Sequence, residues 1–272
     1  MQWWCSASGT PWTWTPQYYP GVWLMVAVLA VTYHALSRRA RAQGESRGAF
    51  WGGWLAVGLV WQVLDWPLGP LAAGYLSSAH ALQFVVLALV APPLLLRATR
   101  RPLAAAVPTA GRARTAALLV TQPIIAAVLF NLVAIATHVP AVVDSLMPTQ
   151  FGAFTIDLLW LIGGLVLWWP IIVEAPPRPW FSAPVRMLYL FLGTLVHTGI
   201  AMVMLVRDFP MYGIYELAPP WQAWSPLEDQ HLAGGIMELA GAAVVFGIIT
   251  VIFFRWSGGV EGDHAPPAPP RD

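Results

Sequence analysis

Apolar residues along this chain gather into seven long stretches, separated by short segments that hold most of the arginines and many of the prolines. A helix needs about 20 predominantly apolar residues to cross a bilayer, and each stretch is close to that length. The pattern predicts spans at residues 21–37, 49–66, 75–96, 115–137, 151–173, 183–206 and 229–255. We therefore expect an all-α integral membrane bundle of seven transmembrane helices.

The segments on either side of the bundle differ in character. Residues 1–20 contain no Lys or Arg, so the basic start of a cleavable signal peptide is missing. Residues 257–272 are rich in Pro and Gly, a composition that favours disorder. The chain is thus predicted to comprise an outer N-terminal segment at residues 1–20, a seven-helix transmembrane domain at residues 21–256 and a disordered cytoplasmic tail at residues 257–272.

Composition supports the membrane assignment and removes several other classes. The 272 residues are 58% hydrophobic and 10% charged, whereas soluble domains are roughly 25% charged. A formal net charge of +1 gives no field that would attract nucleic acid. Glycine-rich phosphate loops, dinucleotide fingerprints and Ser-His-Asp signatures are absent from the sequence, so no nucleotide chemistry is indicated.

The arginines orient the predicted bundle, because cytoplasmic loops collect positive charge. Arg207 alone falls in the loops on one side. The other thirteen arginines fall in loops on the opposite side: Arg38, Arg39, Arg41, Arg47, Arg97, Arg100, Arg101, Arg112, Arg114, Arg178, Arg186, Arg255 and Arg271. This asymmetry places the N-terminus outside and the C-terminus in the cytoplasm.

Ionisable side chains at membrane depth are costly, so each one inside a span is a functional candidate. In the predicted orientation, His80, His138, His197 and His231 lie in the outer halves of four different spans. Met237 adds a thioether nearby, and imidazole with thioether suits copper. Haem ranks lower, because no pair of histidines recurs on one helix at the spacing often used to stack two haems.

The depths of these residues predict how a site would be arranged. His80, His138 and His231 lie near the outer surface and are expected to form one shallow histidine site. At 1.5 Å per residue, His197 and Met237 lie deeper, so they form either a second position on an inward path or ordinary packing.

Five segments together resemble a family of bacterial seven-span membrane proteins, the CtaG-type cytochrome c oxidase assembly factors. They are His80 followed by Pro92-Pro93, Asn131 followed by Thr137-His138-Val139-Pro140, Leu167-Trp168-Trp169-Pro170, the pair Tyr212 and Tyr215, and Ser225 to Met237 with Asp229-Gln230 and Ala233-Gly234. Their order along the chain matches that of the family. Two positions depart from the family pattern, since Phe84 and Asp157 stand where it has histidines.

The resemblance implies a non-enzymatic role in the bacterial inner membrane, aiding copper delivery or insertion into a haem-copper oxidase at the outer face. Its implied metal ligands are His80, His138, His197, His231 and Met237. Asp65, Asp157 and Asp229 would then orient imidazoles through their second nitrogen. Membrane lipid and the oxidase subunits are the implied partners.

Two alternatives stay open at this point. The departures at Phe84 and Asp157 favour a structural or accessory subunit of a membrane energy-converting complex, without its own metal. Asp157 and Glu238 as intramembrane carboxylates would instead suit a small-solute or proton transporter.

The predicted outer loop at residues 207–228 is the candidate surface for a partner. Tyr212, Tyr215, Trp221 and Trp224 lie there among four prolines, so the loop cannot form a long helix. Such aromatic residues either lie in the lipid headgroup layer or anchor a partner protein.

Overall fold

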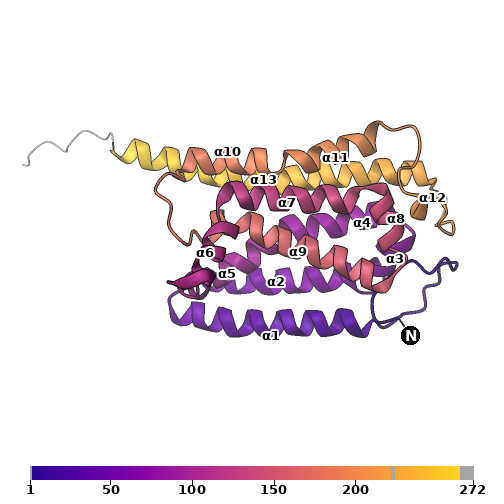
Figure 1. Ribbon diagram of the computed structural model, residues 1–272, viewed down its shortest axis with the longest axis horizontal. Helices are drawn as coiled ribbons and strands as arrows, with labels where there is room; N and C mark the ends of the chain where they lie inside the picture. Colours follow the sequence, from indigo (N-terminus) through magenta and orange to yellow (C-terminus); the bar gives the residue numbers. More distant parts are fainter. Residues whose placement is uncertain (1, 222–223, 264–272) are drawn as a thin grey trace, which may run out of the picture.

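The computed structural model describes residues 2–221 and 224–263, and in this part of the chain every regular element is a helix. In chain order these are α1 (Pro20–Ala42), α2 (Arg47–Leu64), α3 (Leu68–Gly74), α4 (Ser77–Phe84), the π-helix η1 (Val85–Val90), α5 (Ala91–Ala105), α6 (Gly111–Val120), α7 (Pro123–His138), α8 (Pro140–Leu146), α9 (Gln150–Ile172), α10 (Ala183–Gly193), α11 (Leu195–Val206), α12 (Gly213–Glu216) and α13 (Pro226–Asp263). The longer helices lie side by side along the molecule (Figure 1).

The two ends of the bundle differ. One end holds α6 and the loops that follow α1 and α9, and the other holds the N-terminal segment with α3, α8 and α12 (Figure 1). Every described arginine except Arg207 lies toward the first end, in α1, α2, α5, α6, α10, α13 or the loop after α9, and we call this the arginine end. Helix α4 begins and α7 finishes at the second end, which we call the histidine end.

The expected spans correspond to helices or helix pairs of the structure. Among the described residues, five helical stretches are long and apolar enough to cross a membrane, and the number rises to seven if two bent pairs each form one span. The bent pairs are α2 with α3, at 50°, and α6 with α7, at 68°. The structure thus supports a multi-pass helical membrane protein with five to seven candidate spans.

The predicted span at residues 115–137 is wrong as a single helix. Helix α6 ends at Val120, and α7 starts at Pro123 after a bend of 68°. Proline lacks the backbone N–H that continues a helix and disfavours helical geometry in the residue before it, so the break falls just ahead of Pro123. None of the residues of α6 is buried, in keeping with its position away from the core.

The predicted disordered tail also needs a correction. Helix α13 continues to Asp263, past the expected boundary at residue 257, while residues 264–272 lie outside the described part. Adding residues to a helix that has already formed costs little, so even Gly258 and Gly259 extend it.

One helical stretch forms the centre of the bundle. Helices α4, η1 and α5 form one continuous helical stretch. In its most apolar segment 83% of the residues are buried, whereas the corresponding share is 17% in α1 and in α13. The π-helical segment precedes Pro92, which has no N–H for the carbonyl of Ala88. Trp168 Nε1 donates to that carbonyl at 3.3 Å. The surrounding helices therefore separate this central stretch, and the polar side chains on it, from lipid.

The N-terminal segment packs across the histidine end. Trp4, Cys5 and Tyr19 are 1%, 3% and 1% exposed. The backbone N–H of Ala7 donates to the carbonyl of Met147 at 3.1 Å, which ties the segment to the end of α8. The segment thus covers the bundle at the end where the predicted site lies.

Candidate functional site

Three of the predicted histidines gather with aromatic rings inside the bundle. His80 on α4 and His138 at the end of α7 have ring centroids 6.5 Å apart. Trp160 on α9 lies against both, at 4.7 Å from His80 and 5.8 Å from His138. Phe84 contacts His138 at 5.0 Å and His197 on α11 at 6.3 Å. We call these five residues the histidine cluster.

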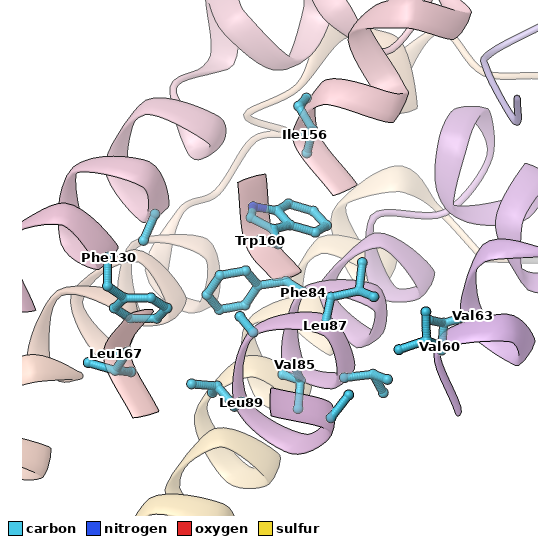
Figure 2. Packing of buried hydrophobic residues seen from close by; sticks show 14 of the residues in the cluster. Val60, Val63, Phe84, Val85, Leu87, Leu89, Phe130, Ile156, Trp160 and Leu167 are labelled. Carbon is cyan, nitrogen blue, oxygen red and sulfur yellow. The ribbon is translucent and has the colours of Figure 1, made fainter. Parts of the chain in front are cut away.

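Phe84 links this cluster to the hydrophobic core. Its ring lies between Trp160 and Phe130, with centroid distances of 5.4 Å and 6.5 Å (Figure 2). Leu167 and Ile156 continue the apolar packing along α9 (Figure 2). The imidazoles therefore lie in surroundings that exclude water.

The free nitrogens of these imidazoles are the chemically informative feature. His138 Nδ1 lies 2.8 Å from the carbonyl oxygen of Ala134, and His197 Nδ1 bonds the carbonyl of Thr194. A carbonyl can only accept, so Nδ1 carries the proton and Nε2 presents a lone pair in both neutral rings. Among the described residues, neither Nε2 has a hydrogen-bond partner, and His80 has none on either nitrogen.

Unpaired buried polar atoms are costly, so they call for an explanation. Imidazoles that ligate a metal typically donate their other N–H to a carbonyl or carboxylate, as His138 and His197 do here. His138 and His197 therefore share one feature with metal-ligating imidazoles, a backbone acceptor on Nδ1 that leaves Nε2 free among the described residues.

Asp229 positions His80 through the start of α4. Its carboxylate on α13 accepts from the backbone N–H of Ser77 at 2.6 Å, from that of Ser78 at 3.3 Å and from both hydroxyls. The first N–H groups of a helix lack intrahelical partners, and an anion there also interacts favourably with the helix dipole. His80 follows directly in the first turn of α4, so this contact fixes its place.

Two hydrogen bonds position His138. Trp160 Nε1 donates to Thr137 Oγ1 at 2.8 Å, which joins α9 to the last turn of α7. The Tyr212 hydroxyl donates to the carbonyl of His138 at 3.2 Å. Burial and the charge of Asp144 raise the pKa of Tyr212, so its phenol keeps the proton that it donates. The end of α7 is therefore held from two sides.

The predicted shallow site of His80, His138 and His231 is not assembled. His231 Nε2 lies 3.0 Å from the carbonyl of Arg207 at the molecular surface. Within residues 2–221 and 224–263, no three His, Cys, Asp or Glu side chains are grouped to hold a metal ion. His231 lies in the second turn of α13, on a face turned toward the loop after α11, and helical spacing alone does not show that direction.

The deeper predicted pair, His197 on α11 and Met237 on α13, lies buried where these two helices pack together. Met237 is fully buried in the core cluster. His197 lies against the backbone of α13, where a Cβ added to Gly241, one turn after Met237, would lie 2.5 Å from Nε2. Glycine at this position lets the imidazole approach the helix backbone.

The three aspartates predicted to orient imidazoles bond to other donors. Asp65 accepts from Trp61 Nε1 at 2.8 Å, and Asp157 from Trp4 Nε1 at 2.9 Å. Asp229 caps α4, as described above. Among the described residues, none of these three carboxylates accepts a hydrogen bond from an imidazole.

Two of the four aromatic residues predicted to bind a partner are enclosed by the protein itself. Tyr212 and Tyr215 are 3% and 4% exposed, and the Tyr215 hydroxyl donates to the carbonyl of Ala72 at 2.7 Å. Trp221 packs against Trp12 at 5.0 Å. Trp224 is 52% exposed and stays available to a partner or to lipid headgroups.

Sequence reasoning missed Trp160 as a member of the histidine cluster and Trp4 as the partner of Asp157. Trp160 lies seven residues before Leu167, within an apolar stretch, and nothing in its spacing separates it from packing residues. Trp4 lies 153 positions from the carboxylate that it contacts, so no local pattern connects the two. Thr137 carried a usable signal, because it directly precedes a candidate histidine.

One comparison with known proteins is informative. A family model described as cytochrome c oxidase caa3 assembly factor matches residues 29–258, which include the whole histidine cluster. No curated protein and no solved structure matches the chain.

Proposed function

Since the chain belongs to the cytochrome c oxidase caa3 assembly factor family, we propose that it assists oxidase assembly by holding copper for delivery or insertion at the outer face. The observation that carries the proposal is the pair of buried imidazoles, His80 and His138, with unpaired nitrogens. The role is binding and transfer, without a catalysed reaction of its own.

The donor set fits a single low-coordinate ion. With metal–nitrogen bonds of about 2.0–2.1 Å, two imidazoles bound to one ion in a nearly linear arrangement have centroids roughly 6 Å apart. His80 and His138 have centroids 6.5 Å apart. Cu(I) accepts two soft or borderline ligands, and the faces of Trp160 and Phe84 can stabilise its charge. When bound, copper would be the cargo.

The surroundings suit transfer better than permanent storage. Among the described residues two imidazoles come this close together, whereas structural metal sites are usually closed by four ligands. An open coordination position leaves room for a ligand from the receiving protein. Trp224, half exposed at the histidine end, is the aromatic anchor available for that contact.

Outer-face action follows from the two ends of the bundle. Arginines mark the cytoplasmic side of bacterial membrane proteins, and here all but Arg207 among the described ones belong to the arginine end. The start of α4, which carries His80, and the end of α7, where His138 lies, are at the opposite end (Figure 1). We infer that this end faces outward, with the N-terminus outside and the C-terminus in the cytoplasm.

One observation favours the structural or accessory subunit as a second candidate. Asp157, which stands in a position where the family resemblance leads us to expect a histidine, is bonded to Trp4 and takes no part in the cluster. A protein that keeps the fold and the oxidase partner but binds no copper would show this arrangement.

A copper-retention experiment separates the two candidates. The purified protein is loaded with Cu(I), washed, and assayed for bound copper beside the variants His80→Ala/His138→Ala and His231→Ala. The native protein and the His231 variant should each retain about one copper, and the double variant should retain clearly less. Thermal melts in detergent verify that all three are folded. Equal retention by native protein and double variant would contradict the copper proposal.

The same variants test the function in cells. In a strain lacking the gene, the native protein and His231→Ala should restore oxidase activity and the haem a spectrum, and the double histidine variant should restore them only with added copper. Full restoration by the double variant without added copper favours the structural subunit. No loss of oxidase upon deletion would remove the assembly role itself.

A further inference from the structure

A cleft at the arginine end has no part in the proposed copper function. It lies between α5, α9, α10 and α13 and has a volume of about 740 Å³, and its charged lining residues are Arg97, Arg100, Glu174, Arg186 and Arg255. We call it the arginine cleft. Its volume falls within the range of ligand-binding pockets, roughly 300–1,000 Å³.

Two of the four guanidinium groups are compensated by acidic groups. Arg186 forms a bidentate pair with Glu174, at 2.7 Å and 2.9 Å, and Arg100 pairs with Glu45 at 2.9 Å. Arg97 and Arg255 make no ion pair or hydrogen bond within the described residues. Among the described residues, two of the four positive charges of the cleft thus have no counter-ion, which favours an anionic ligand.

The rest of the cleft wall is apolar. Helix α13 contributes Val244, Gly247, Ile248, Val251 and Ile252 ahead of Arg255, positions that share one helical face. At 1.5 Å per residue this face extends roughly 16 Å away from the guanidinium. Its ligand should thus have a long apolar part joined to a negative head.

Gly247 leaves space in that wall. A Cβ built on this residue would meet no atom within 4 Å, apart from the excluded neighbouring backbone of its own helix. Neighbouring side chains from α5 and α9, including Leu94 and Ile172, line the same cleft without filling this space.

We propose that the arginine cleft binds one anionic phospholipid, with its phosphate held by Arg97 and Arg255 and an acyl chain along the α13 wall. Arginine's planar fork matches phosphate geometry. The arginine end is also the level at which the headgroups of the cytoplasmic leaflet would lie in the inferred orientation, and basic pockets between spans there bind acidic lipids. The lipid would join α13 to the central helix.

The second large groove does not support a similar assignment. It lies between α1, α5, α6 and α9, with a volume of about 610 Å³, and no charged side chain lines it. Nothing there selects one occupant over bulk lipid.

Lipid retention measured by native mass spectrometry tests the proposal. The purified protein is mixed with phosphatidylglycerol or phosphatidylcholine and stripped gradually of detergent. One phosphatidylglycerol should remain, and Arg97→Gln/Arg255→Gln should lower its retention by roughly tenfold or more. The control Arg112→Gln/Arg114→Gln removes the same charge from α6, outside the cleft, and should retain the lipid.

A second variant tests the apolar wall with the charges intact. Gly247→Leu places a side chain into the open space and improves helix propensity, so the fold should be kept while the acyl chain is displaced. Thermal melts verify folding of every variant. Equal retention of both lipids, equal loss in cleft and control variants, or full displacement by inorganic phosphate at matched concentration would each overturn the proposal. None of these outcomes bears on copper binding at the opposite end.

Discussion

At the scale of single residues, Trp4 shows how a distant side chain makes a buried carboxylate tolerable. Asp157 is 5% exposed within α9, where an unpaired carboxyl group would be costly. Trp4 Nε1 supplies a donor at 2.9 Å and packs edge-to-face on Phe154, at 4.9 Å between centroids. The N-terminal segment is thereby held on the bundle by one polar and one aromatic contact.

Replacing Trp4 by Phe should therefore destabilise the protein by about 1–3 kcal/mol, because a buried acceptor loses its donor. Thermal unfolding in detergent measures the loss. Trp3→Phe is the matched control, since Trp3 is 40% exposed and should change stability little. In the background Asp157→Leu, Trp4→Phe should cost much less. An equal cost in both backgrounds would mean that ring volume, and not the hydrogen bond, holds the segment.

At the scale of elements, the contact between α13 and α4 sets the geometry of the histidine cluster. Asp229 lies near the start of α13. Its carboxylate accepts hydrogen bonds from the backbone N–H groups and the hydroxyls of both Ser77 and Ser78. One carboxylate thus joins the starts of two helices that are far apart in the chain. His80 depends on this contact, because the first turn of α4 carries it.

Asp229→Ala should lower stability by about 2–3 kcal/mol and reduce copper retention, whereas Asp229→Asn keeps an acceptor oxygen and should fall between. Asp208→Ala, at an exposed position in the loop after α11, serves as the control. Thermal melts and the copper-retention assay provide the two readouts. Unchanged copper retention in a folded Asp229→Ala protein would show that the cap does not position His80.

At the scale of the whole molecule, the separation of arginines from histidines predicts the topology. Reporter fusions at Gly44, Ala106 and the C-terminus should all read cytoplasmic, and a fusion at Ala141, on α8 at the histidine end, should read external. A cytoplasmic signal at Ala141 would mean that α6 and α7 do not cross as one bent span. Such a result would also place the histidine cluster on the wrong side for outer-face delivery.

Much of this architecture could be predicted from the sequence, because the bilayer imposes local rules. Apolar length predicts where helices lie, and the helical class and the family were both confirmed. Apolar length does not predict where a helix breaks. Pro123, for example, divides one apolar stretch into two helices. Periodicity does not predict the angle between them.

The candidate site, too, could be predicted from the sequence only in part. The positions of His80 and His138 along their helices predicted that both lie at a similar depth, and in the structure their rings are neighbours. The direction in which each side chain points depends on how the helices pack, so only the tertiary structure turned His231 toward Arg207 and placed Phe84 among the imidazoles.

The partners of the buried carboxylates were likewise decided by the tertiary structure. Asp157 bonds to Trp4 and Asp229 to Ser77, each across about 150 residues of chain. A sequence shows that a charged group at membrane depth needs a partner, because desolvation is costly wherever the chain leads. Which donor satisfies it is a property of three-dimensional proximity, and that proximity arises from packing among all the helices at once.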